Sequence, residues 1–152
     1  MVQVSQRVEQ GGVSVGELIS FVVQGEPVAK GRPRFRANGF AYTPAKTANY
    51  ENLVKLEYHN QAGDFMFSDC AELAMRIEAF FGIPKSKSKH DQHMMEIGVM
   101  KHTKRPDADN ILKAVADALN GVAYRDDSAL CYVEVVKKYS RTPQARITIW
   151  EL

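Results

Sequence analysis

Long apolar runs are missing from this sequence, and cysteine is scarce, with two residues. No hydrophobic stretch approaches the roughly 20 residues that a membrane-spanning helix needs. Residues 1–17 contain no continuous apolar segment of the kind found in signal peptides. We therefore expect a cytoplasmic protein with no membrane partner. At 45% hydrophobic and 25% charged residues, the 152-residue chain has the composition of one soluble domain that can bury a core without crosslinks.

Cysteine and histidine are too sparse to predict a structural metal site. The two cysteines, Cys70 and Cys131, stand outside any zinc-ligand spacing, so we expect reduced and buried thiols. The four histidines also lack a partner at ligand spacing, and we interpret them as surface or linker residues. They are His59, His90, His93 and His102.

Acidic residues are absent from Pro27 to Tyr50, although the net charge of the whole chain is only +2. This stretch carries five cations, namely Lys30, Arg32, Arg34, Arg36 and Lys46. A second basic stretch, residues 85–105, begins with Lys85, Lys87 and Lys89. Cations in such a pattern favour contact with a phosphate backbone, and the alternative is a solvated edge without a ligand.

Hydrophobic periodicity divides the chain into strands and helices. Alternating apolar residues predict strands at 73–81, 132–139 and 145–150, the last two as an antiparallel pair. The apolar segment 20–24, preceded by Leu18 and Ile19, predicts a buried strand. Helical spacing predicts helices at 44–61 and from Asp109 to about Gly121, and a short helix capped by Ser88. Residues 30–44 have no helical period and are predicted to form a long loop or a hairpin that turns at Asn38-Gly39.

These elements predict the α+β class. We expect a single two-layer domain, in which helices pack on one face of a mixed β-sheet. Internal repeats and a glycine-rich phosphate loop are both lacking. Residues 1–17 are predicted to be a flexible N-terminal extension of a domain that covers residues 18–152.

Five aspartates gather around one short predicted helix. They are Asp107, Asp109, Asp117, Asp126 and Asp127. Such a cluster repels itself unless cations share it, and Mg²⁺ binds through one or a few carboxylates while keeping several waters. Spacing by four places Asp109, Lys113 and Asp117 on one helix face, where a lysine can stabilise charge on a phosphate. The pattern predicts metal-assisted phosphodiester hydrolysis.

Simpler structural roles account for the same acids and for the aromatic residues beside the cations. Asp109 alone is typical of a helix cap, Asp126-Asp127 of a turn, and Lys113 with Asp117 of an exposed ion pair. Phe35, Phe40 and Tyr42 are able to stack on bases of distorted DNA, while Phe40 and Tyr42 equally suit a protein core. Composition and spacing leave both interpretations open.

Several segments in order resemble the motifs of the RusA-like crossover junction endodeoxyribonucleases, the Holliday junction resolvases found in bacteria and their phages. The most specific is Pro-Asp-x-Asp-Asn-x-x-Lys followed by Asp-Asp. The resemblance runs from about Gly25 to the C-terminus, so residues 18–152 are expected to form a RusA-like endonuclease domain. The matching segments are GEPVAKGRPRF (25–35), YTPAKTANYE (42–51), IPKSKSK (83–89), RPDADNILKAVADALNG (105–121) and YRDDSAL (124–130).

The resemblance implies a homodimer that nicks a four-way junction symmetrically with Mg²⁺, or with Mn²⁺ in its place. It implies Asp107, Asp109 and Asp127 as catalytic acids and metal ligands, and Lys113 as the catalytic lysine. The link from the helix to the Asp-Asp pair is one residue shorter here, so the choice between Asp126 and Asp127 stays open. It also implies DNA binding by the basic stretch, for which we expect contacts from Lys30, Arg32, Arg34, Arg36, Lys46, Lys85, Lys87 and Lys89.

Two other functions stay open from the sequence. One is a non-catalytic DNA-binding or replication accessory module that keeps the acids only for caps and turns. The other is a nuclease with a broad preference for branched DNA. Nicking assays on junctions, flaps and linear duplex distinguish all three.

Overall fold

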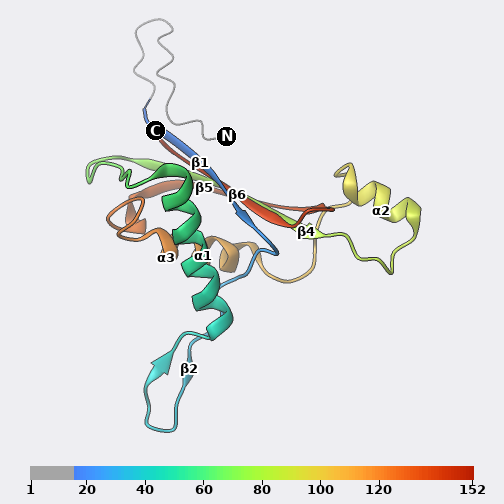
Figure 1. Ribbon diagram of the computed structural model, residues 1–152, viewed down its shortest axis with the longest axis horizontal. Coiled ribbons are helices and arrows are strands. Elements are labelled where there is room, and N and C mark those ends of the chain that lie inside the picture. The colour runs from blue at the N-terminus through green and yellow to red at the C-terminus, as the bar shows by residue number, and fades with distance from the viewer. Residues whose placement is uncertain (1–15) are drawn as a thin grey trace, which may run out of the picture.

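A four-stranded mixed sheet with strand order β1-β6-β4-β5 lies at the centre of the computed structural model, which describes residues 16–152. β1 and β4 both pair antiparallel with β6, whereas β4 and β5 pair in parallel. A separate two-stranded hairpin projects from the body (Figure 1). The sheet strands are β1 (Leu18–Gln24), β4 (Leu73–Gly82), β5 (Leu130–Ser140) and β6 (Gln144–Glu151), and the hairpin strands are β2 (Arg34–Phe35) and β3 (Ala41–Tyr42).

The alternation of apolar residues along each strand determines which face of the sheet meets the core. In β4 the alternate residues Met75, Ile77 and Ala79 are completely buried, while Arg76 between them is exposed. Successive side chains of a strand point to opposite faces, so these apolar residues share one face. Ile147 of β6 pairs with Ile77 and is buried on the same face.

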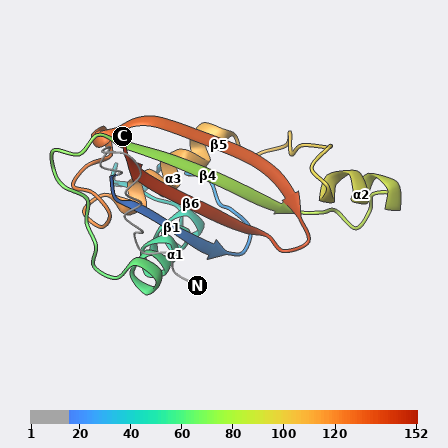
Figure 2. The ribbon, with the colours of Figure 1, turned by 90° about the horizontal axis from the view of Figure 1, so that it is seen from above.

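Two helices cover that apolar face. α1 (Ala45–Ala62) buries Tyr50, Val54 and Tyr58 at helical spacing, and α3 (Ala108–Leu119) buries the stripe that includes Ile111, Val115 and Leu119. α2 (Lys89–Glu96) lies beyond the end of the strands (Figures 1 and 2). The predicted α+β domain, with helices packed on one face of a mixed sheet, is confirmed. None of the helices described in residues 16–152 has the length and apolar character needed to cross a membrane.

The predicted antiparallel pair of the last two strands is wrong. Only residues 141–143 separate β5 from β6, and a link of this length normally joins neighbouring strands. Here β4 lies between them and pairs with both. The link passes the end of β4, where the backbone N–H of Gly25 donates a hydrogen bond to the carbonyl of Pro143 at 3.0 Å.

The predictions for cysteine and histidine also need correction. Cys70 and Cys131 are both exposed. Cys131 falls where the register between β4 and β5 shifts, with Leu130 and Tyr132 paired on either side of it, so this extra residue faces outward. His102 is buried and stacks on Phe81 with ring centroids 3.9 Å apart, so it is not a surface residue.

Helix boundaries agree with the sequence to within a few residues. Ser88 caps α2, because its hydroxyl accepts a hydrogen bond from the backbone N–H of Asp91 at 3.0 Å. α3 begins one residue before Asp109, so Asp107 is the N-cap residue and Asp109 lies in the first turn. Most of the predicted extension, residues 1–17, lies outside the described residues. Glu17 is described, and its carbonyl accepts a hydrogen bond from the backbone N–H of Glu151 at 3.0 Å.

Candidate active site

Helix α3 presents one face to a hollow of about 340 Å³ between the helix and the start of β5. Asp109, Lys113 and Asp117 line it from the helix, and Asp127 lines it from the short 3₁₀ turn Asp127–Ala129. The opposite, apolar side of α3 packs into the core and fixes the orientation of the helix. The apolar part of the wall comes from Leu112, Ala116, Leu130 and Val133. The structure therefore brings three carboxylates and one ammonium group to a single hollow.

Lys30 connects the basic stretch to this hollow. Its ammonium group forms a salt bridge with Asp117 at 3.0 Å and a second, short one with Glu51 of α1. The side chain of Lys30 is only 20% exposed. Burial by itself lowers the pKa of Lys30, but its bonds to Glu51 and Asp117 outweigh burial, and the pKa lies above the ordinary value of 10.5. Lys30, predicted as a DNA contact, thus has its charge paired within the protein.

Tyr124 packs in the core two positions before Asp126. Its ring is buried and its hydroxyl donates a hydrogen bond to the carbonyl of Ala116 at 3.0 Å. Burial raises the pKa of Tyr124, and the negative charges of Asp127, Asp117 and Asp126 raise it further. The hydrogen bond of this hydroxyl ties the middle of α3 to the segment that directly precedes Arg125 and the Asp-Asp pair.

The two adjacent aspartates Asp126 and Asp127 face different surroundings. Asp127 lines the hollow with Asp109, whereas Asp126 lines a neighbouring hollow of about 290 Å³. The carboxylate of Asp126 accepts a hydrogen bond from the backbone N–H of Ser128 at 3.3 Å and caps the 3₁₀ turn. Hydrogen bonds from Ser128 lower the pKa of Asp126. The turn role considered for this pair therefore belongs to Asp126.

Asp107 stands at the N-terminus of α3, one residue before the first helical position. It is exposed, and its side chain caps no backbone amide of the helix. It is not among the residues that line the hollow. Within residues 16–152 no three Asp, Glu, His or Cys side chains are gathered closely enough to hold a metal ion. The predicted trio of Asp107, Asp109 and Asp127 is therefore not assembled as a closed ligand set.

The chemistry of the hollow still fits a hard divalent cation. Asp109 and Asp127 offer carboxylate oxygens, and the hollow is open to solvent. Mg²⁺ is commonly held by one or two carboxylates, with waters and substrate phosphates completing its shell. The unpaired backbone N–H groups at the start of α3 favour an anion there as well. The side chains present are those that a magnesium ion bound together with a phosphate requires.

Apart from Lys30, the predicted DNA-binding cations fall in three places, one of which is the tip of the β2-β3 hairpin, where Arg36 is exposed. Arg32, Arg34 and Lys46 line a groove of about 530 Å³ that also includes Pro106, immediately before Asp107. This groove contains no acidic residue among its lining side chains. The other cations, Lys85, Lys87 and Lys89, lie on the segment that leads into α2, at the far end of the sheet (Figure 1).

Sequence reasoning missed the ion pairs of Lys30 and the position of Tyr124. Glu51 is 21 positions from Lys30 in the sequence, and the packing of α1 places the Glu51 carboxylate next to the Lys30 ammonium group. A signal for Tyr124 was present, since it directly precedes the segment Arg125-Asp126-Asp127 within an apolar run, but an apolar run does not specify a phenol hydrogen bond. Both features depend on tertiary packing.

Comparisons with known proteins identify the family of this chain. A protein of Bacillus subtilis strain 168, YqaN, which is described as uncharacterized, is 35% identical over 141 residues that cover 90% of this chain and 98% of that protein. The family model of endodeoxyribonuclease RusA matches residues 24–150, a segment that contains α3, the Asp-Asp pair and the basic groove. This chain belongs to the RusA family of endodeoxyribonucleases.

Proposed function

We propose that this protein is a magnesium-dependent endonuclease that resolves Holliday junctions by paired, symmetric nicks. The observation that carries the proposal is the hollow lined by Asp109, Lys113 and Asp127, together with a separate groove lined by cations. Carboxylates for a metal and cations for a phosphate backbone are the two components of phosphodiester hydrolysis. Family membership supports the endodeoxyribonuclease activity.

In this proposal Asp109 and Asp127 hold the metal, with Asp107 as a third ligand from the same end of α3. When bound, Mg²⁺ supplies positive charge beside the scissile phosphate and a water of lowered pKa. The ammonium group of Lys113 interacts with a non-bridging phosphate oxygen and stabilises the negative charge that grows as the water oxygen attacks phosphorus in line. The bond from phosphorus to the leaving sugar oxygen breaks, and no covalent enzyme intermediate forms.

Lys30 has a positioning role in this proposal. Its ammonium group forms a salt bridge with the Asp117 carboxylate at 3.0 Å, so that this carboxylate does not compete for the metal. Because the backbone N–H of Lys30 also donates to the carbonyl of Asn110 in α3 at 2.8 Å, the same residue fixes the groove relative to the catalytic helix. Arg32, Arg34 and Lys46 then contact DNA phosphates.

The homodimer is part of the proposal. Two copies related by a two-fold axis present two equivalent sites, which suits the near two-fold symmetry of a four-way junction. β5 is an edge strand of the sheet, and Tyr132 on it is 52% exposed, so this strand offers apolar surface for a second copy. DNA as the substrate supports the cytoplasmic location expected from the sequence.

The proposal is tested by site variants on a synthetic four-way junction. Asp109→Asn and Asp127→Asn should each abolish nicking in Mg²⁺ while junction binding is kept or strengthened, because one charge that repels phosphate is removed. Asp64→Asn is the matched control, since the side chain of Asp64 is fully exposed and pairs with His59, away from the hollow. Wild-type rates in the Asp109→Asn variant would refute the assignment. Binding by wild-type protein without any nicking would favour the non-catalytic alternative.

A further inference from the structure

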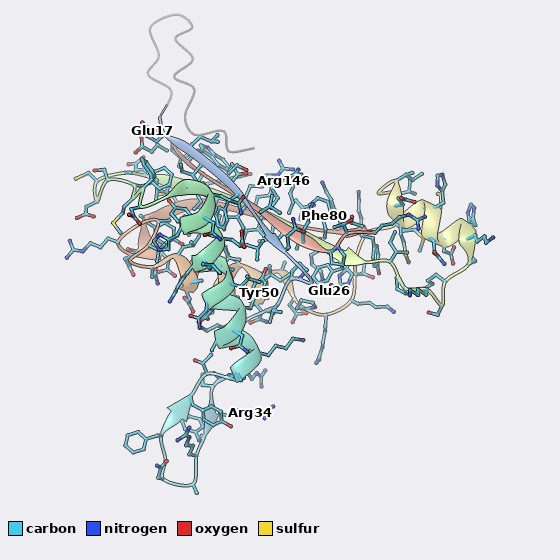
Figure 3. All side chains as sticks on the ribbon, in the orientation of Figure 1. Glu17, Glu26, Arg34, Tyr50, Phe80 and Arg146 are labelled. Atoms are coloured by element: carbon cyan, nitrogen blue, oxygen red, sulfur yellow. The ribbon has the colours of Figure 1, made fainter. Side chains whose placement is uncertain are left out.

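The hairpin that carries β2 and β3 is the most exposed part of the described chain. Every residue from Arg32 to Thr43 is exposed, and the side chains of Phe35 and Phe40 are 74% and 71% exposed. Figure 3 shows Arg34 on this hairpin, far from the sheet residues Phe80 and Arg146. Burial of a phenylalanine ring stabilises a fold, so two rings kept in water contribute nothing of this kind to folding. Exposed apolar groups of this size indicate a contact with another molecule.

The base of the hairpin is anchored while its tip is free. The backbone N–H of Gly31 donates to the hydroxyl of Thr47 in α1 at 3.0 Å. On the adjacent residue, the ammonium group of Lys30 binds carboxylates of α1 and α3. The position of the hairpin is therefore defined relative to α3, the helix that carries Asp109 and Lys113.

The two faces of the hairpin carry different groups. Arg34 pairs with Tyr42, so these side chains share one face, and the guanidinium group of Arg36 lies 5.5 Å from the centre of the Tyr42 ring. Phe35 pairs with Ala41, which places the Phe35 ring on the opposite face. Cations mixed with exposed rings, in a stretch without a single acid, fit a polyanion that also offers flat apolar surfaces.

We propose that Phe35 and Phe40 stack on DNA bases exposed at a branch point, and that this contact distinguishes branched from linear DNA. The inference rests on the proposed nuclease function. Bases inside a linear duplex are stacked on their neighbours and offer no free face to a ring, whereas a branch point interrupts this stacking. The cations of the groove contact phosphates, which both kinds of DNA have. The rings therefore supply selectivity, and the cations supply affinity.

A double variant tests the selectivity. Phe35→Ala with Phe40→Ala should raise the Kd for a four-way junction about tenfold or more, as expected for loss of base stacking, and should leave the Kd for linear duplex and its salt dependence unchanged. The matched control is Leu56→Ala with Met66→Ala, which removes two other apolar side chains that are 54% and 45% exposed. An unchanged ratio of junction to duplex affinity in the first variant would overturn the proposal.

A fluorescent ring at the tip gives a direct reading of the contact. Trp150 is the only tryptophan, so Trp150→Phe with Phe40→Trp places a single reporter on the hairpin. In EDTA, which prevents cutting, a four-way junction should quench this tryptophan and a linear duplex of equal length should not. Equal quenching by the four-way junction and the linear duplex would contradict the proposal. A change from dimer to monomer in the Phe35→Ala, Phe40→Ala variant would do the same, because the rings would then form a subunit contact.

The results separate this inference from the proposed function. If wild-type protein nicks junctions in Mg²⁺ and the double variant keeps full junction preference, only the stacking proposal fails. If junctions quench the tryptophan reporter of the Phe40→Trp variant but wild-type protein nicks none of them, the stacking proposal stands and the nuclease assignment fails.

Discussion

Replacement of Lys30 by methionine should destabilise the protein by about 2 kcal/mol. The side chain of Lys30 is 20% exposed, and those of Glu51 and Asp117 are 17% and 27% exposed. Loss of one partner from a fully buried ion pair costs about 3–5 kcal/mol, and the remaining exposure of these groups to solvent reduces that cost. For a chain of this length, about 2 kcal/mol corresponds to a fall in Tm of about 4–8 °C.

The measurement is thermal unfolding followed by circular dichroism at pH 7 and low salt. Lys30→Met with Asp117→Asn should be more stable than Lys30→Met alone, because the double change removes one of the two carboxylates left without a cation. A Tm within about 1 °C of wild type for Lys30→Met, or no rescue in the double variant, would refute the reasoning.

The pH dependence of the same variant has a defined sign. The folded state raises the pKa of Lys30 above 10.5, so the stabilisation is complete below that pH and is lost as the pH rises through the folded-state pKa. The difference in stability between wild type and Lys30→Met should therefore be constant near neutrality and shrink above pH 10.5. If the difference in stability between wild type and Lys30→Met grew in this alkaline range, the claim that the ion pairs of Lys30 stabilise the fold would be contradicted.

Three further changes test individual contacts of the sheet, the core and α3. The hydrogen bond from Lys138 lowers the pKa of Glu78 despite burial. Glu78→Gln should therefore lower the free energy of unfolding by about 1–2 kcal/mol at pH 7, and this loss should disappear as the pH falls below 4.5. Urea unfolding at pH 7 and at a pH below 4.5 checks this. Tyr124→Phe leaves the carbonyl of Ala116 without its donor, so the free energy of unfolding measured in urea at pH 7 should fall by about 1 kcal/mol. Equal stability of the variant and the wild type would show that this hydrogen bond does not stabilise the fold. Ile147→Ala leaves a cavity at a completely buried position, so the free energy of unfolding in the same assay should fall by about 2–5 kcal/mol. A fall below about 1 kcal/mol would show that neighbouring side chains move in to fill the cavity.

Local patterns predicted most of the elements because each one is encoded by neighbouring residues. Alternation from Leu73 to Phe81 reflects a strand with one face on the core, and the structure places that strand at 73–82. The helix predicted at 44–61 is observed at 45–62, with Pro44 directly before it. The face shared by Asp109, Lys113 and Asp117 also follows from spacing alone, and these three side chains do line one hollow.

Long-range arrangement could not be predicted in the same way. A three-residue link between two alternating runs indicates a hairpin, yet β4 occupies the position between β5 and β6. Which strand inserts there depends on the whole sheet, including the bulge at Cys131. The pairing of Lys30 with Glu51 and Asp117 likewise depends on how α1 and α3 pack, and spacing along the chain carries no signal for it.

The most direct test of the central claim is a nicking assay in which wild-type protein meets a synthetic four-way junction with Mg²⁺ or with EDTA, and products are mapped on all four strands. We expect nicks only with Mg²⁺, at symmetric positions in two opposing strands. Tight binding of the junction without a metal-dependent nick on any strand would contradict the claim that the carboxylates of α3 and the following turn serve phosphodiester hydrolysis.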